Sequence, residues 1–492
     1  MVCRSAVPPS RFEGLIEVIS LRTAAFKVGT QGISSQHLQR TPKDHYVQRR
    51  RSGASSADDL TLEGLRISDF GRAPARQDLP RGLNQLSNTC YLNSVLQYFY
   101  TIKDLRETVV SMSKDAGTST SGSVMSRSRI DGRLLTPQDI ARSMSFVGEL
   151  ACLFEKLERD KSPSITPTTR LARLALGTLE ESGDIGRQHD VTECMANCTF
   201  HLKVALLQSG HSGVAEALRP TAQYESGLIQ RLFCGTIRQR IVAWPCITNS
   251  QSAAKSNKED LFSHLILNVT EDGIDIHDGL ISYFDDENVF EFDGQECRME
   301  VELLEMPLLL QMHIQRAQFD LKTRRPFKNQ AYIVFGETLY MDRYVVGGDP
   351  LKKRKSKVIQ DELQTCRSRL SVLRQNERRT EQVQAETAGL QVRMKELKGA
   401  LESLWEDSKS FPYDLTSVFV HSGHTGDHGH YFLYSRNVPA HPDEWLKYND
   451  SEVTMVVKEE IFADTTGHTT NPYLLVFAQK GSCVVNTVNR VV

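Results

Sequence analysis

The sequence lacks the features that would point to a membrane or a nucleic acid. No uninterrupted apolar run approaches the ~18 residues that a membrane-spanning helix needs. Lysine plus arginine (59) nearly balance aspartate plus glutamate (61), and the net charge of -2 gives no reason to expect a nucleic-acid surface. The N-terminal region has no apolar signal core, and Glu13 and Glu17 are untypical of a transit peptide. We therefore expect neither a membrane nor a nucleic acid as a partner.

The ten cysteines include no C-x-x-C pair, which is the arrangement typical of zinc ribbons. Their scatter along the chain also argues against a disulfide framework, so we expect a reducing compartment, the cytoplasm or the nucleus. Cys194, Cys198 and His201 fall on one helical face, but a small apolar stripe packed in the core explains their spacing better than a metal site. We predict no metal ion and no cofactor.

What the sequence does contain is 39% hydrophobic and 24% charged residues, the proportions of a globular protein with a sizeable core. Residues 1–80 carry few large apolar side chains and are expected to be largely disordered. Helical patterns predominate over 81–228, whereas short β-branched segments typical of strands follow over 229–350 and 409–480. Residues 481–492 are expected to form a C-terminal tail. The chain is therefore predicted to belong to the α+β class, with one main domain over 81–480.

Residues 351–408 interrupt the strand-rich region with a segment that is almost free of glycine. Apolar residues recur there at four- and three-residue steps, the a/d spacing of a coiled coil, in two runs over 359–373 and 390–404. The two runs do not share one register, which favours an antiparallel helical hairpin, although a single long helix with a stammer is an alternative. A two-helix hairpin leaves apolar surface exposed, so we expect self-association or a partner helix at this insertion.

The stretch GLNQLSNTCYLNSVLQ (82–97) places a lone cysteine where a polar loop becomes a helical repeat. Apolar residues recur at three- and four-residue spacing over 92–99, and Asn88 and Thr89 before them are good N-cap residues. Cys90 is then expected in the first helical turn, where unpaired N–H groups and the helix dipole favour a thiolate. A buried structural cysteine is the alternative that this stretch alone leaves open.

A second stretch, VFVHSGHTGDHGHYFLYSR (418–436), supplies a candidate base. Four histidines in one loop also suggest a metal site, but the loop contains no cysteine, and His430 begins an alternating strand that directs its side chain. Asn449 and Asp450 end the next short strand, WLKYND. A cysteine at a helix N-terminus, a histidine on a strand and an Asn or Asp on the next strand make up a cysteine-protease triad. In such a triad the imidazole moves the proton and the third side chain orients it.

Four ordered motifs resemble those of the ubiquitin-specific proteases, the papain-like deubiquitinases. GLNQLSNTCYLNSVLQ is similar to the cysteine box of the family, and HSGHTGDHGHYFLYSRN with WLKYNDSEVT and YLLVFA is similar to its histidine box. GRQHDVTECM (186–195) resembles the Gln-x-Asp-x-x-Glu helix, and LLLQMHIQRAQFD resembles the palm strands. The resemblance covers about residues 82–478, and the insertion looks most like that of fungal members.

This resemblance implies a right hand of thumb (81–228), fingers and palm (229–350 and 409–480), with the helical insertion at 351–408. It implies a thiol hydrolase that cleaves the bond after the C-terminal glycine of ubiquitin. Carried over by position, Cys90 is the nucleophile, His430 the general base and Asn449 the third triad residue, while the neighbouring Asp450 assists.

The resemblance also marks two departures from the family pattern. Gln85 stands at the position of the oxyanion donor, which is usually asparagine, and Ser87 replaces a usual glycine, so slowed chemistry is expected. The fingers of the family usually hold zinc through two C-x-x-C pairs, whereas this region has only Cys234, Cys246 and Cys297, so no structural zinc is expected.

Six residues fall where the family binds the extended C-terminal tail of ubiquitin: Gln188, Asp190, Glu193, Arg316, His421 and Tyr431. Ubiquitin and ubiquitinated proteins are therefore the expected partners. Two alternatives remain open. One is a catalytically weak ubiquitin-binding scaffold on the same fold, and the other is a metal hydrolase that uses the histidine loop.

Overall fold

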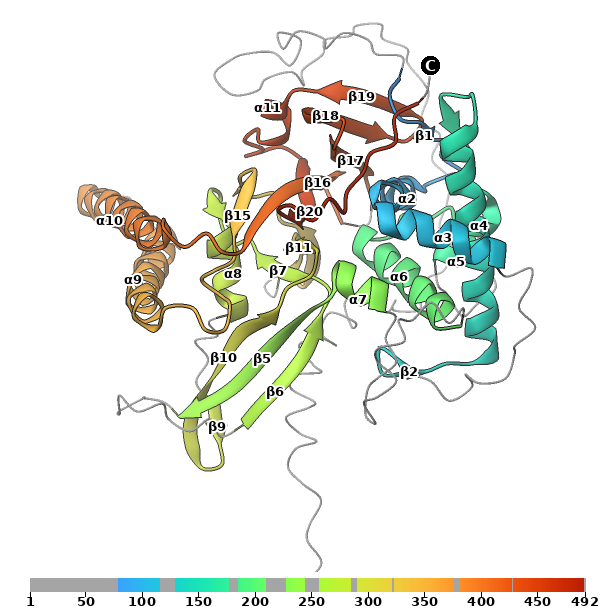
Figure 1. The fold of residues 1–492 in the computed structure, drawn as a ribbon. Coiled ribbons are helices and arrows are strands. Elements are labelled where there is room, and N and C mark those ends of the chain that lie inside the picture. The colour runs from blue at the N-terminus through green and yellow to red at the C-terminus, as the bar shows by residue number, and fades with distance from the viewer. Residues whose placement is uncertain are drawn as a thin grey trace, which may run out of the picture. The chain divides into compact units, whose positions relative to one another are not determined.

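Helices dominate the first part of the described chain (Figure 1). The structure, a computed structural model, describes residues 78–115, 129–176, 185–208, 227–243, 256–284, 290–320, 323–375, 380–426 and 428–490, all within the compact unit Asp59–Val492. The expected disorder of residues 1–80 thus falls, up to residue 77, outside the described residues. The helices of this part are α2 (Cys90–Thr101), α3 (Lys103–Asp115), α4 (Pro137–Arg159), α5 (Thr169–Ala175), α6 (Val191–Gln208) and α7 (Gly227–Phe233). No helix in the described ranges is long and apolar enough to cross a bilayer.

The helix α2 lies at the centre of this group. Every one of its residues is buried, as expected of a helix that has apolar neighbours on all sides. It contacts α3 and α6 among the helices and strand β17 (His430–Asn437) of the main sheet. The contact with β17 brings the start of α2 next to the start of that strand.

The largest sheet has eight strands among the described residues. Its order is β19-β18-β17-β16-β20-β11-β7, and β15 pairs with the start of β16. Adjacent strands are antiparallel except β7 and β11, which are parallel. Besides β17, the strands are β7 (Leu265–Asn268), β11 (Leu309–Gln315), β15 (Thr338–Tyr340), β16 (Pro412–Ser422), β18 (His441–Asn449), β19 (Glu452–Val456) and β20 (Thr470–Gln479).

Alternating side chains of this sheet fill two separate cores. Tyr431 and Leu433 of β17 belong to the core shared with the helices, whereas Phe432 and Tyr434 belong to the core on the opposite face. This alternation is what a strand buried on both faces requires. The second core is covered by α8 (Ile276–Phe284), which contacts β7. Helices and sheets in one chain confirm the predicted α+β class.

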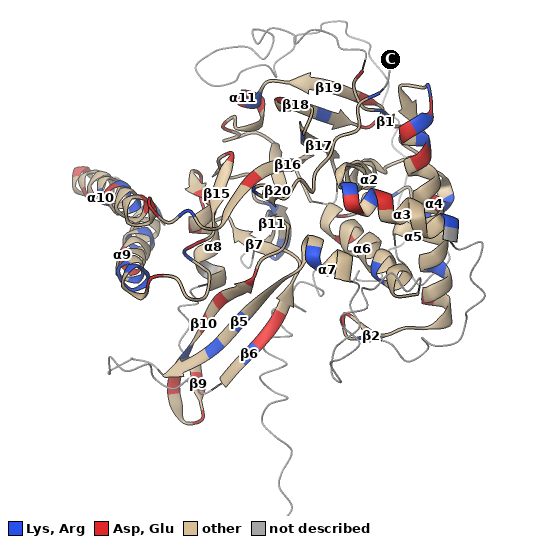
Figure 2. Cartoon of the chain, in the orientation of Figure 1, with Lys and Arg blue, Asp and Glu red and all other residues tan. Residues whose placement is uncertain are grey.

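A second, antiparallel sheet has the strand order β6-β5-β10-β9. Its opposite charges face each other across the strands, with Arg238 beside Glu302 (2.9 Å) and Arg240 beside Glu300 (2.8 Å). Figure 2 shows acidic and basic residues interspersed on these strands. The strands are β5 (Gly235–Ala243), β6 (Ser256–Phe262), β9 (Phe290–Phe292) and β10 (Gln295–Glu305).

Short strand pairs and one short helix complete the described structure. β1 (Gly82–Leu83) pairs with β4 (Ser164–Ile165), β2 (Arg129–Ile130) with β3 (Arg133–Leu134), β8 (Ile274–Asp275) with β14 (Ile333–Val334), and β12 (Ala317–Asp320) with β13 (Arg325–Lys328). The helix is α11 (Lys458–Ile461).

Two helices, α9 (Pro350–Gln375) and α10 (Glu381–Trp405), occupy the segment where the sequence predicts an insertion. Ion pairs join Glu362 to Arg393 (2.8 Å) and Arg369 to Glu386 (2.6 Å), so the two helices run in opposite directions. We refer to α9 and α10 as the helical insertion. They pack on each other through apolar residues at the predicted spacing: Ile359, Leu363, Cys366, Leu390, Met394 and Leu397.

A buried carboxylate ties the helical insertion to α8, which the sequence does not indicate. The Asp278 side chain is 5% exposed, with Arg367 Nη2 at 2.5 Å from Oδ1 and Lys398 Nζ at 2.6 Å from Oδ2. Burial alone would raise the pKa of Asp278, but these two cations outweigh it and lower the pKa. One carboxylate on α8 therefore holds both helices of the insertion.

The predicted C-terminal tail packs against the domain as far as residue 490. Val484 and Val485 are buried. The backbone N–H of Asn486 donates to the carbonyl oxygen of Thr101 at 2.7 Å, at the end of α2. Residues 481–490 therefore form part of the folded unit.

Candidate active site

Cys90 is the first residue of α2, as the sequence predicts. Its side chain is buried, and its Sγ accepts a hydrogen bond from the backbone N–H of Tyr431 at 3.3 Å. Thr89 is the N-cap residue, but its hydroxyl makes no bond to the helix and accepts instead from the backbone N–H of Leu86. Thr89 thus occupies the predicted N-cap position without a side-chain cap bond. Backbone N–H groups at the start of α2 remain available to stabilise negative charge beside Cys90.

His430 lies at the first position of β17, between Cys90 and Asn449. Its Nε2 donates to Asn449 Oδ1 at 2.6 Å, which leaves Nδ1 for Cys90. The hydrogen bond with Cys90 raises the pKa of His430 to about 9; burial opposes this rise, and Asn449 and Asp450 reinforce it. The imidazole is therefore protonated at neutral pH and places a positive charge beside the Cys90 sulfur.

Strand pairing explains how these residues meet. In the antiparallel pair of β17 and β18, Leu433 lies opposite Tyr448, so the start of β17 lies beside the end of β18. Asn449 is the last residue of β18 and therefore reaches His430. Asp450 follows in a tight turn with a φ of 51°, a left-handed conformation that aspartate tolerates better than most residues.

The Asp450 carboxylate lies between His430 and the segment that precedes α2. Gln85 Nε2 donates to its Oδ2 and Asn93 Nδ2 donates to its Oδ1, both at 2.7 Å. The distance from Oδ2 to His430 Nε2 is 3.8 Å, too long for a hydrogen bond but short enough for attraction to a protonated ring. Asn93 is not among the predicted site residues. The available signal is a polar side chain within a wholly buried helix, one turn after Cys90.

Gln188 and His421 contact the loop that precedes His430. Gln188 Oε1 accepts from the backbone N–H of Gly429 at 2.6 Å, and its Nε2 lies 3.2 Å from His421 Nε2. Burial, followed by the charge of Lys328, lowers the pKa of His421 to about 4. The His421 ring is therefore neutral at pH 7 and can accept from the Gln188 amide. The structure thus brings these two predicted residues together beside the predicted base.

Asp190 caps α6 and is held from several sides. Its Oδ1 accepts from the backbone N–H groups of Thr192 (2.7 Å) and Glu193 (3.3 Å), and the Tyr473 hydroxyl donates to Oδ2. Burial alone would raise the pKa of Asp190, but His313 and these hydrogen bonds outweigh it and lower the pKa. Glu193 is exposed in the first turn of α6, so it is the more accessible of the two predicted carboxylates.

Arg316 and Tyr431 differ from the other predicted residues, because their side chains are 0% and 1% exposed. The Arg316 guanidinium donates to the carbonyl oxygens of Asn329 (3.0 Å), Ala331 (2.9 Å) and Pro472 (2.5 Å). Burial lowers the pKa of Arg316 to about 10. In this structure neither side chain presents a surface to a ligand, and Arg316 fixes the backbone of a loop instead.

Lys328 fixes the backbone on the same side of the site and is not among the predicted site residues. Its Nζ donates to the carbonyl oxygens of His421 (3.0 Å), Gly423 (3.1 Å) and Thr469 (2.6 Å). Burial, and after it the charge of Arg316, lowers the pKa of Lys328 to about 7. Its three partners come from strand and turn positions that no local spacing relates to this lysine.

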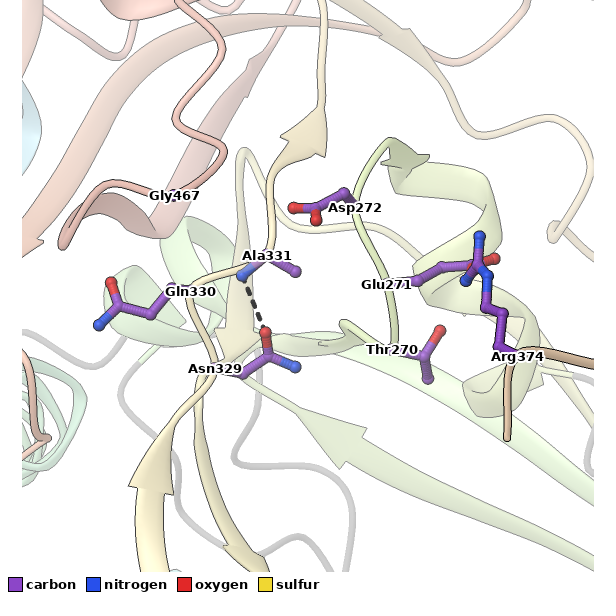
Figure 3. Close-up of a pocket in the computed structure, with 8 residues that line it drawn as sticks. All are labelled: Thr270, Glu271, Asp272, Asn329, Gln330, Ala331, Arg374 and Gly467. Carbon is purple, nitrogen blue, oxygen red and sulfur yellow. Dashed lines mark hydrogen bonds and ion pairs between the residues drawn. The ribbon is translucent and has the colours of Figure 1, made fainter. Parts of the chain in front are cut away.

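A pocket of about 440 Å³ lies beside the loop that Arg316 holds (Figure 3). Arg374 of α9 contributes one wall, where it pairs with Glu271. None of the lining residues is a predicted site residue, so this pocket is separate from the Cys90 centre. They are Thr270, Glu271, Asp272, Asn329, Gln330, Ala331, Arg374 and Gly467.

Among the described residues, no group of three or more His, Cys, Asp or Glu side chains is placed to hold a metal ion. Cys194 and Cys198 are buried in the helical core. His201 Nδ1 lies 2.9 Å from Ser143 Oγ, and its Nε2 lies 2.9 Å from the carbonyl oxygen of Leu174. This stripe packs in the core, as its spacing predicts.

A family model described as ubiquitin carboxyl-terminal hydrolase matches residues 81–477. The chain belongs to the ubiquitin carboxyl-terminal hydrolase family. The match spans the helix that begins with Cys90, the segment before α6 that carries Gln188, and the strands that carry His430 and Asn449. It confirms the resemblance to ubiquitin-specific proteases that the sequence motifs suggest.

Curated relatives in this family include proteins from two fungi. The chain is 28% identical to the probable ubiquitin carboxyl-terminal hydrolase 2 of Schizosaccharomyces pombe, over 82% of this chain and 45% of the relative. It is 24% identical to ubiquitin carboxyl-terminal hydrolase 2 of Saccharomyces cerevisiae, over 82% of this chain and 42% of the relative. A match to the rat ubiquitin carboxyl-terminal hydrolase 48 is 23% identical, over 76% of this chain and 28% of the relative. The chain thus spans less than half the length of each of these relatives.

Proposed function

We propose that this chain is a deubiquitinating thiol hydrolase that cleaves the isopeptide or peptide bond after the C-terminal glycine of ubiquitin. The observation that carries the proposal is the hydrogen-bonded series from Asn449 through His430 to Cys90 at the start of α2. Family membership and the names of the relatives support ubiquitin as the substrate class. The helical part corresponds to a thumb, the main sheet to a palm, β5, β6, β9 and β10 to fingers, and α9 and α10 to an inserted hairpin.

In the proposed reaction, the Cys90 thiolate attacks the carbonyl carbon of the terminal glycine of ubiquitin. The carbonyl oxygen becomes an oxyanion, which the Gln85 amide and the N–H groups at the start of α2 stabilise. When this intermediate collapses, the bond to the amine breaks, and the amine leaves with the proton of His430. Neutral His430 then takes a proton from water as the water attacks the thioester, and Cys90 is released. Asn449 keeps the imidazole oriented throughout.

The tail of ubiquitin is proposed to bind along the segment from Gln188 to Glu193. Glu193 offers an exposed carboxylate to a cationic side chain, and Asp190 and Gln188 set the backbone around it. His421 holds the Gln188 amide through the contact between their Nε2 atoms at 3.2 Å. Arg316, being buried, contributes by holding the surrounding backbone, and buried Tyr431 packs against His421 and Tyr473.

The helical insertion is proposed to mediate self-association or to bind a partner helix, and the cytoplasm or the nucleus is the proposed compartment. Val358, Val372 and Val392 are 67%, 59% and 60% exposed on its surface. Figure 2 shows acidic and basic residues interspersed along α9 and α10. Ubiquitinated proteins are the proposed substrates.

The direct test is reaction with a ubiquitin whose C-terminus carries an electrophile, followed by mass spectrometry of the adduct. We expect one covalent adduct, located at Cys90, and turnover of a fluorogenic C-terminal amide of ubiquitin. Cys90→Ala is the matched control and should give neither. An adduct without turnover would favour the weak ubiquitin-binding scaffold, whereas turnover that a chelator abolishes would favour a metal hydrolase.

A further inference from the structure

The Asp450 carboxylate accepts hydrogen bonds from two primary amides. Gln85 Nε2 donates to Oδ2 and Asn93 Nδ2 donates to Oδ1, both at 2.7 Å. The backbone adds a third link, because the carbonyl oxygen of Asp450 accepts from the N–H of Leu83 at 2.7 Å. Asp450 therefore ties the turn between β18 and β19 to the segment that precedes Cys90.

Asp450 is poorly placed to orient His430 directly. Its Oδ2 lies 3.8 Å from His430 Nε2, whereas Asn449 Oδ1 lies 2.6 Å from the same nitrogen. The single N–H at Nε2 is thus already taken by Asn449. The hydrogen bonds that Asp450 does make are those with Gln85 and Asn93.

The Gln85 side chain needs the hydrogen bond to Asp450, here called the anchor, more than a shorter asparagine side chain would. Its side chain is exposed, and its extra methylene gives it more rotamer freedom to lose when it is ordered. A primary amide carries two N–H groups, so the bond to Asp450 occupies one and leaves the second for a carbonyl oxygen. The anchor therefore orders the amide without using up its capacity to donate.

Asn93 holds the carboxylate from the buried side. It is 3% exposed, and its Nδ2 also lies within hydrogen-bond distance (3.2 Å) of the Leu83 carbonyl oxygen. Asn93 follows Cys90 by three residues in α2, a spacing that places both on one side of the helix. Cys90, the nucleophile, and Asn93, which holds Asp450, thus belong to the same helix, α2.

We propose that Asn93 and Asp450 are positioning residues that hold the Gln85 amide in place as a donor to the oxyanion. The proposal rests on the hydrolase function proposed above. As Cys90 adds to the glycine carbonyl, the second N–H of Gln85 donates to the developing oxyanion while Asp450 keeps the first. Neither positioning residue gains or loses a proton.

Two ubiquitin derivatives separate this role from a role in activating Cys90. A C-terminal aldehyde forms a tetrahedral hemithioacetal when Cys90 Sγ adds to its carbonyl carbon and the carbonyl oxygen takes up a proton. Cys90 Sγ adds to the internal carbon of a C-terminal alkyne while the terminal carbon takes up a proton, which gives a vinyl thioether, so no oxyanion forms. Asp450→Ala should raise the inhibition constant of the aldehyde and lower kcat on the fluorogenic amide by about 10²-fold, the typical effect of losing one oxyanion donor. The rate of alkyne labelling and KM should stay within about threefold.

A double-mutant cycle then assigns the effect to Gln85. Gln85→Ala should lose as much kcat as Asp450→Ala, and the variant with both changes should lose no more than either alone, because they remove one interaction. Asp450→Asn keeps one acceptor oxygen and should recover part of the loss. Asn93→Ala should reproduce a fraction of it. Should Asn93→Ala fail to fold, the cycle of exposed Gln85 with Asp450 still decides the proposal.

Asn84→Ala is the matched control, because the neighbouring amide of Asn84 donates to Thr166 Oγ1 at 2.9 Å instead. It should leave all three measurements unchanged. Slower alkyne labelling in Asp450→Ala, or losses that multiply when Gln85→Ala is added, would overturn the positioning role and assign Asp450 to His430. Failure of the unmodified protein to react with both ubiquitin derivatives would instead overturn the proposed function.

Discussion

Two carboxylates of this chain, one buried and one partly buried, are held in different ways. The Asp450 side chain, 15% exposed, accepts hydrogen bonds from the uncharged amides of Gln85 and Asn93. The Asp278 side chain, 5% exposed, pairs with the cations of Arg367 and Lys398. Amide donors satisfy the oxygens of a carboxylate but leave its negative charge, whereas cations also cancel that charge.

This difference separates a site arranged for chemistry from one arranged for attachment. The Asp450 carboxylate links the Gln85 amide to Asn93, which follows Cys90 by one turn of α2. The charge of Asp278 is balanced by Arg367 and Lys398, and these ion pairs join α8 to the helical insertion. Substitutions around Asp450 should therefore change kinetics with little effect on stability, and substitutions around Asp278 should do the reverse.

The strongest kinetic effect should come from Cys90→Ala. Removal of the nucleophile should lower turnover of a ubiquitin C-terminal amide by at least about 10³-fold, because the remaining groups only bind and polarise the substrate. Binding of ubiquitin, followed by calorimetry, should persist, and the melting temperature should shift by no more than about 3 °C. Residual turnover within about tenfold of the unmodified protein would contradict the assignment of Cys90.

The strongest effect on stability should come from Asp278→Ala. Its loss leaves Arg367 and Lys398 without the carboxylate that offsets their burial, so the free energy of unfolding should fall by about 3–5 kcal/mol. Urea denaturation measures this change. The values of kcat and KM for the folded variant should equal those of the unmodified protein.

Asp275→Asn is the matched control for that experiment. Asp275 Oδ2 lies 3.7 Å from Lys398 Nζ, farther than the Asp278 carboxylate does. Burial, and after it the charge of Asp278, raises the pKa of Asp275. A change to the neutral amide should therefore cost about 1 kcal/mol or less. Equal destabilisation by the two substitutions, or a lowered kcat in Asp278→Ala, would break the separation between attachment and chemistry.

The parts of the site that follow from the sequence are those with a local pattern. Cys90 begins a helix because apolar residues recur at helical spacing after it. His430 begins a strand, and the alternation of polar and apolar residues in HYFLYS predicts that strand. The two helices of the insertion follow from four- and three-residue steps in the same way. Asn449 and Asp450 could be placed together because they are adjacent where the next strand ends.

The parts that do not follow are contacts between distant segments. Asn93 and Asp450 lie 357 positions apart, and no periodicity relates them. The same holds for Asp278 and its two cations. Arg316 shows a further limit: a motif position suggests a residue that lines a channel, but three carbonyl oxygens converge on its guanidinium and bury it. Side-chain type and order along the chain do not reveal which backbone groups need a donor.

The pH dependence should sharpen the account of the active site. The pKa of His430, raised from 6.5 to about 9 by Cys90 and Asn449, means that the protonated ring persists through neutral pH. The contribution of this charged form is complete below pH 6.5 and is lost as the pH rises through about 9. Accordingly, kcat/KM should fall about tenfold per pH unit above that value.

Asn449→Ala tests the cause of this shift. Without the hydrogen bond to Nε2, the fall in kcat/KM should begin at a lower pH, and the loss at neutral pH should be smaller than for His430→Ala. An unchanged pH profile in Asn449→Ala would mean that the hydrogen bond with Cys90, rather than Asn449, sets the pKa of His430.

The smallest kinetic effect is expected where the change to the chain is largest. Replacement of residues 353–408 by a short Gly/Ser linker removes the helical insertion but no residue that contacts Cys90 or His430. The rate of reaction with an electrophilic ubiquitin should therefore stay within about twofold. The truncated protein should nevertheless be less stable, because Asp278 then remains buried without Arg367 and Lys398.

Adding Asp278→Asn to the truncated protein distinguishes attachment from a need for the helices themselves. A neutral amide no longer requires a cation, so this second change should restore part of the lost free energy of unfolding, although the same change destabilises the full-length chain. Light scattering of both forms would show whether α9 and α10 also mediate self-association, as their exposed valines suggest. If the truncated protein stays insoluble or unreactive with Asp278→Asn present, the insertion is part of the core on which the active site depends. In that case the contrast between Asp450 and Asp278 would no longer separate chemistry from attachment.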